Sequence, residues 1–81
     1  MESLNKDSML EVLAFAKTGV EVEINKLNAK IERGRKLLNE VKDIPTQDRY
    51  RKTISDIEKQ VQDLEAKWKK YDDMIFFSDF E

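Results

Sequence analysis

Apolar residues in the second half of the chain recur at alternating intervals of four and three. The positions are Tyr50, Ile54, Ile57, Val61, Leu64, Trp68, Tyr71 and Ile75. This spacing lays side chains along one stripe of a helix and is typical of a coiled-coil seam. The first half carries a matching seam, which Lys17 and Gly34 interrupt. Its apolar members are Leu10, Leu13, Val20, Ile24, Leu27, Ile31, Leu38 and Val41. Two seams joined by one turn predict an all-α fold, an antiparallel two-helix hairpin.

Local signals place the ends of the two helices. Ser8 is followed three residues later by a glutamate, the spacing of a capping box at a helix start. Pro45 disfavours helical geometry at Ile44 and has no amide proton, so the first helix is predicted to end near Asp43. Thr46 is the predicted N-cap of the second helix. These signals predict a single helical-hairpin domain over residues 1–81, with helices over 8–43 and 47–77, a turn over 44–46 and an aromatic, acidic tail over 78–81.

Folding the chain at Pro45 predicts which seam residues face each other. Facing residues then have numbers that total about 95, so that Gly34 faces Val61 and Lys17 lies beside Ser78. In this register residues 8–16 have no partner in the second helix, because their opposite positions lie beyond its predicted end at residue 77. The first helix is therefore expected to overhang by about two turns.

A second apolar stripe runs along the other side of the first helix. It comprises Val12, Phe15, Gly19, Val22, Lys26 and Ala29, again at intervals of three and four. A surface helix in a monomeric hairpin needs only one apolar face, so the second predicts contact with another helix. We expect a homo-oligomer: a dimer of hairpins that forms a four-helix bundle, or a higher assembly. The predicted oligomer interface is Met9, Leu10, Val12, Leu13, Phe15, Gly19 and Val22.

Further apolar side chains cluster near the C-terminus among acidic residues. Met74, Phe76, Phe77 and Phe80 are the predicted docking residues for a protein partner. The alternative is that these aromatics fold back over the overhang of their own chain.

Charge is distributed unevenly along the predicted hairpin. Residues 26–52 hold nine basic and four acidic side chains, whereas the whole chain has a net charge of −2. The turn end is therefore positive and the open end negative. Arginine forks suit phosphate, which makes the turn-proximal basic residues candidates for binding nucleic acid or another phosphate-bearing ligand. They are Arg33, Arg35, Lys36, Arg49, Arg51 and Lys52. The alternative is an ordinary solvated surface.

Several kinds of chemistry are missing from the sequence. The chain has no cysteine and no histidine, which removes the common zinc ligands, thiol nucleophiles and neutral-pH bases. We therefore expect no cofactor, no metal and no enzymatic activity. The longest apolar run, residues 12–16, is too short to cross a bilayer, and no membrane association is expected. The expected location is the cytoplasm, which the absence of cysteine fits.

The leading functional hypothesis is a non-enzymatic protein-interaction module, acting as a small inhibitor, adaptor or chaperone. It would self-associate and dock on another protein through its apolar open end. One alternative is a helical-hairpin dimer that binds RNA or a phosphate-bearing ligand through its basic flank. Another is a structural subunit of a larger coiled-coil complex.

Overall fold

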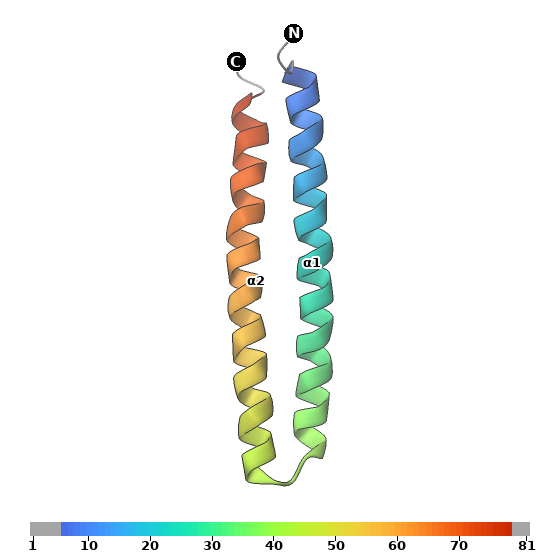
Figure 1. Cartoon of the computed structure of the whole chain (residues 1–81), viewed down its shortest axis with the longest axis vertical. Helices are drawn as coiled ribbons and strands as arrows, with labels where there is room; N and C mark the ends of the chain where they lie inside the picture. The colour runs from blue at the N-terminus through green and yellow to red at the C-terminus, as the bar shows by residue number, and fades with distance from the viewer. Residues whose placement is uncertain (1–5, 79–81) are drawn as a thin grey trace.

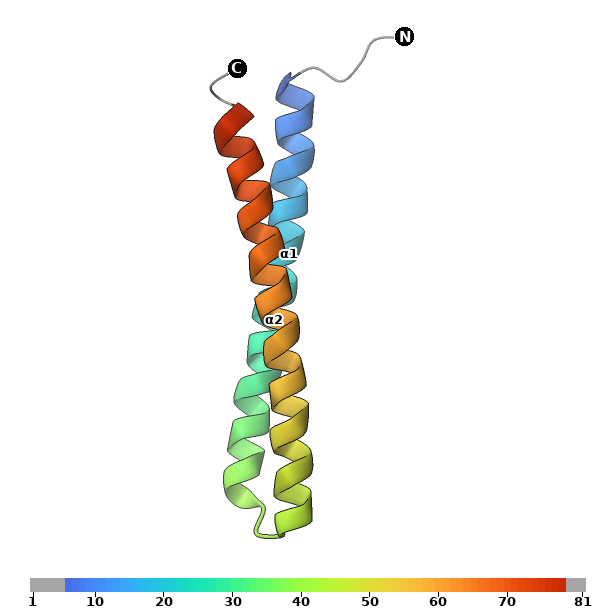
Figure 2. The same ribbon diagram turned by 90° about the vertical axis from the view of Figure 1, so that its left-hand side faces the viewer.

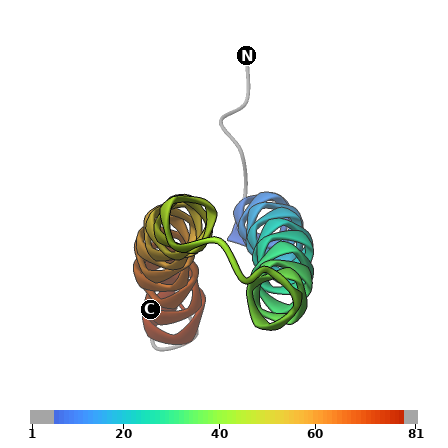
Figure 3. The same ribbon diagram turned by 90° about the horizontal axis from the view of Figure 1, so that it is seen from below.

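The chain forms a two-helix hairpin. A computed structural model describes residues 6–78, which comprise α1 (Lys6–Glu40) and α2 (Ile44–Ser78). The helices run antiparallel and lie side by side over most of their length, joined by a short turn (Figure 1). They cross at a shallow angle (Figure 2), and the view along the rod shows the turn bridging their ends (Figure 3). The molecule is a rod of 62 × 19 × 17 Å. The predicted all-α hairpin is confirmed, and the described residues contain no strand.

The core of the hairpin is the predicted seam. Every seam position from residue 10 to residue 75 is buried or half-buried. The most buried side chains among residues 6–78, each 6–8% exposed, are Val20, Leu27, Ile31, Ile54 and Val61. They form one row of packed apolar side chains between the helices, because intervals of three and four return a residue to the same side of the helix. Such a core is small for an 81-residue chain, so each of its members carries a large share of the stability.

The register between the helices differs from the predicted one. Lys17 contacts Asp72, Glu21 contacts Trp68, and Gly34 lies against Ile54. The numbers in these pairs total 89, 89 and 88, not 95. The reason is the place of the turn: the non-helical residues are 41–43, three positions before the predicted 44–46. Moving the turn by three residues changes the sum of facing residue numbers by six. One helix is therefore displaced along the other by close to one heptad.

The corrected register removes most of the predicted overhang. Both helices contain 35 residues, and Ser78 lies level with residue 11 of α1. Only residues 6–10 extend past the described end of α2, which is little more than one turn. Residues 11–16, predicted to have no neighbour, have α2 alongside them. The prediction of a two-turn overhang was wrong because it placed the fold at Pro45.

A different residue from the predicted one caps α2. The carboxylate of Asp43 accepts hydrogen bonds from the Thr46 amide (3.0 Å) and the Thr46 hydroxyl (2.6 Å). Its carbonyl accepts the first helical bond, from the Gln47 amide at 3.0 Å. Asp43 is therefore the N-cap, and Thr46 is inside the first turn. Pro45 fits there because the amides of the first turn have no partner within the helix.

Asp43 makes the stability of the turn dependent on pH. The hydrogen bonds from Thr46 lower the pKa of its carboxyl. A lowered folded-state pKa means that its stabilising effect is present above the titration range of an unfolded aspartate and is lost as the pH falls through the folded-state value. We predict that Asp43→Ala lowers the melting temperature by a few degrees at neutral pH. Asp43→Asn should lower it by less, because the asparagine side chain can still cap the helix. Melting curves at neutral and acidic pH check this. Equal losses for both variants at neutral pH would contradict the capping role.

Candidate functional site: the open end of the hairpin

The second stripe of α1 is uncovered in the folded chain. All six of its members, residues 12, 15, 19, 22, 26 and 29, are exposed, whereas the seam on the other side of the helix is buried. Phe15 is 78% exposed, Val12 57% and Val22 48%. Among residues 6–78, the other helix does not cover these side chains, because α2 occupies the opposite side of α1. The stripe is an apolar surface directed at solvent.

Two of the predicted interface residues face the chain itself. Leu10 and Leu13 are half-buried because they belong to the seam, and α2 extends further along α1 than predicted. Met9, Val12, Phe15, Gly19 and Val22 are exposed, as an interface in the isolated chain requires. The exposed part of the predicted interface is therefore these five residues.

The apolar residues near the end of α2 are also exposed. Met74 is 45%, Phe76 55% and Phe77 63% exposed. The two phenylalanine rings contact each other edge to face, with centroids 5.3 Å apart and planes at 82°. Phe80, the fourth predicted docking residue, lies outside the described residues. Among residues 6–78, seven of the nine exposed large apolar side chains lie on the half of the rod away from the turn, so most of the exposed apolar surface belongs to the open end.

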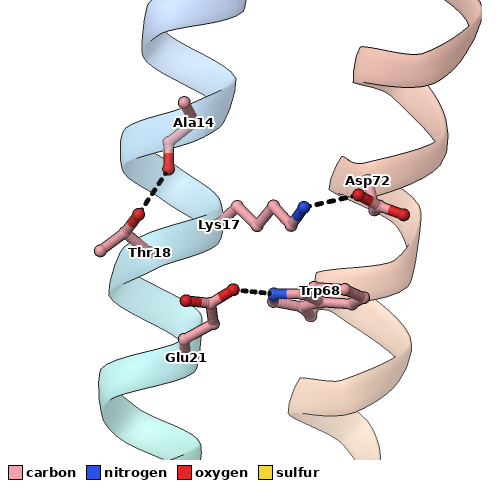
Figure 4. Close-up of polar contacts among 6 residues, drawn as sticks. All are labelled: Ala14, Lys17, Thr18, Glu21, Trp68 and Asp72. Carbon is pink, nitrogen blue, oxygen red and sulfur yellow. Dashed lines mark hydrogen bonds and ion pairs between the residues drawn. The ribbon is translucent and has the colours of Figure 1, made fainter.

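A polar cluster interrupts the seam just inside the open end (Figure 4). The Lys17 ammonium lies 2.5 Å from an Asp72 carboxylate oxygen and 4.4 Å from the centroid of the Trp68 ring. The Trp68 indole N–H donates to the Glu21 carboxylate at 2.7 Å. These four residues form cross-helix bonds that only one register satisfies, and polar seam residues of this kind specify alignment in coiled coils. Lys17 was predicted beside Ser78, so the sequence did not reveal this cluster.

An open groove runs along one side of the hairpin next to this cluster. It has a volume of about 840 Å³, and Ile24, Ala66 and Trp68 contribute apolar surface to it. Its carboxylates are Glu21, Glu65, Asp72 and Asp73. No set of three or more side chains among residues 6–78 is placed to hold a metal ion. The groove was not predicted either, because which residues line it depends on the register.

The basic residues near the turn lie on the surface of both helices. All six predicted phosphate-binding residues are exposed. Arg35 pairs with Glu58 at 3.7 Å, Lys36 with Glu32 at 4.0 Å and Arg51 with Asp48 at 3.1 Å. Arg33 and Lys36 are three residues apart and share one side of α1, whereas Arg35 points to another side. Phosphate binding by these residues stays a prediction.

Comparisons with known proteins add nothing to this geometry. No protein-family model matches the chain, and no curated protein or solved structure is found to be similar. Among the described residues, neither helix is apolar enough over a sufficient length to span a membrane. The exposed surfaces of the hairpin are therefore the features that can indicate a function.

Proposed function

We propose that this protein is a non-enzymatic interaction module that self-associates through α1 and docks on another protein through its open end. The observation that carries the proposal is the exposure of the second stripe, above all of Phe15 at 78%. A helix that packs on one side and carries an ordered apolar row on the other is suited to contact a further helix. Self-association would join two hairpins into a four-helix assembly.

The size of the core supports self-association. Only five side chains among residues 6–78 are less than 9% exposed, and the chain has no cysteine for a disulfide. Small domains of this kind commonly gain stability by oligomerisation. Packing the stripes of two copies together would bury Val12, Phe15 and Val22 of both copies. These side chains would form a second apolar layer besides the seam.

The aromatic end is the proposed docking surface for a different protein. Met74, Phe76 and Phe77 stand outside the stripe, on the other helix, so a dimer formed through α1 need not cover them. Asp73 beside them is exposed, and Asp72 is half-buried in its pair with Lys17. A partner with an apolar groove edged by basic residues would complement this surface. A cytoplasmic location, which the lack of cysteine favours, belongs to the same proposal.

Replacing Phe15 and Val22 together by glutamate tests self-association. Four buried carboxylates in a dimer interface are strongly unfavourable, so we expect the dissociation constant to rise more than tenfold. Both positions are exposed in the single chain, so helicity should be retained. Light scattering over a range of concentrations measures the mass, and circular dichroism measures the helicity.

Two control variants sharpen this experiment. Asn39→Glu with Gln60→Glu adds the same charge at exposed positions outside the stripe and should keep the wild-type mass. Phe76→Ser with Phe77→Ser removes exposed aromatics outside the stripe and should also keep it. A wild-type protein that stays monomeric at every concentration would refute self-association. A lower mass for the Phe76→Ser/Phe77→Ser variant would indicate that the two copies contact each other through the end of α2 and not through the stripe.

A further inference from the structure

The two glycines of the chain occupy different environments. A Cβ atom added at Gly34 would lie 3.1 Å from Cγ1 of Ile54, so the close approach of α2 accounts for that glycine. A Cβ atom at Gly19 would meet nothing within 4 Å. Glycine inside a helix costs about 1 kcal/mol relative to alanine. Nothing in the folded chain offsets that cost at Gly19, which leaves a gap on the exposed stripe.

Phe15 stands one helical turn before this gap. It is the most exposed of the large apolar side chains, at 78%. Val12 and Val22 flank the pair, so the positions 12, 15, 19 and 22 are separated by three, four and three residues. This spacing reads the same in both directions. Reversing the segment places residue 15 on residue 19 and residue 12 on residue 22.

We propose that two copies pair their α1 stripes antiparallel, each Phe15 seated on the partner's Gly19 and each Val12 against the partner's Val22. This inference rests on the proposed self-association and adds its orientation and register. A two-fold axis at the level of Lys17 makes both contacts at once, as a closed isologous dimer requires. An in-register parallel pair would instead set Phe15 against Phe15 and leave a void between two glycines. A staggered parallel pair would seat a phenylalanine on only one of the two Gly19 residues, and it would not form a closed dimer.

One basic residue of the stripe, Lys26, favours the same orientation. It follows a segment, residues 7–23, that contains four acidic and one basic side chain. A parallel dimer would align like charges along the whole helix and put Lys26 beside Lys26. The antiparallel register brings Lys26 level with residue 8 of the partner, between the partner's Asp7 and Glu11. Opposite charges across an interface select the correct orientation and disfavour the wrong one.

The arrangement also places the four helices in space. The stripe lies on the side of α1 away from α2, so the dimer would be a row with the two α1 helices at its centre. The row leaves the aromatic ends of both α2 helices uncovered, which agrees with their proposed docking role.

Exchanging the large and small residues tests the seating of Phe15 on Gly19. We expect Phe15→Ala and Gly19→Leu each to raise the dissociation constant more than tenfold. The double variant carries the large side chain at 19 and the small one at 15, and it should recover to within a few-fold of wild type. Gly19→Leu should not lower helicity, because leucine favours helix and the site is open. Sedimentation measures association, and failure of the double variant to recover would overturn the register.

Cysteine cross-linking tests the orientation, because the native chain has no thiol of its own. Val12→Cys and Val22→Cys proteins are mixed and oxidised, with Asp63→Cys on the outer side of α2 as the control. We expect the mixed Val12→Cys/Val22→Cys disulfide to dominate and the control to remain uncoupled. Dominance of like-with-like disulfides would show a parallel dimer, which overturns this inference and leaves self-association standing. A wild type that never dimerises overturns both.

Discussion

Replacing Leu27 by alanine is expected to lower the free energy of unfolding by about 2–4 kcal/mol. Leu27 is 6% exposed and lies in the centre of the seam. A domain of this size has a total stability of roughly 4–12 kcal/mol, so the loss would be a large fraction of it. Chemical denaturation followed by circular dichroism measures the change.

Leu37 provides a matched control for this substitution. It is the same residue type on the same helix but is 39% exposed, outside the seam. Leu37→Ala should cost less than about 1 kcal/mol. If the two alanine variants unfold at the same denaturant concentration, the seam is not the core of the molecule.

Replacing Gly34 by leucine is expected to destabilise the hairpin by about 2 kcal/mol. The added Cβ atom alone would stand 3.1 Å and 3.3 Å from two carbons of Ile54, and the rest of the leucine side chain would have to displace α2. The gain in helix propensity, about 1 kcal/mol, offsets only part of that cost. Thermal unfolding at a concentration that keeps the protein monomeric measures the effect.

The same substitution at Gly19 is the control, since the two sites differ in what surrounds them. Gly19→Leu should leave the unfolding of the monomer unchanged or raise its midpoint, because no atom lies within 4 Å of the added Cβ. Equal destabilisation at both sites would mean that α2 does not approach Gly34 closely.

The periodicity of the chain was sufficient to predict the hairpin and its core. Side chains such as Leu27 and Val61 lie between the helices because of their spacing alone, whatever residue they face. The exposed stripe followed from the same rule, and Phe15 and Val22 do face away from α2. Whether a second copy covers them stays a prediction.

Register could not be predicted from the same pattern. A heptad repeat packs equally well when one helix slides by seven residues, so the seam does not distinguish a total of 95 from one of 88. The choice depends on the turn, where capping by Asp43 allows Pro45 to enter the helix. The Lys17 contacts with Asp72 and Trp68 agree with that choice, and they could be recognised only once the helices were aligned.

The start of α1 and the end of α2 lie at the same pole of the rod, opposite the turn (Figure 1). An affinity tag or fluorescent protein attached at this pole would share it with Phe77 and could block a partner that binds there. Lys42, exposed in the loop between Val41 and the capping Asp43, is the better attachment point for a label or surface tether. With the label there, a negative binding result can be assigned to the protein and not to its tag.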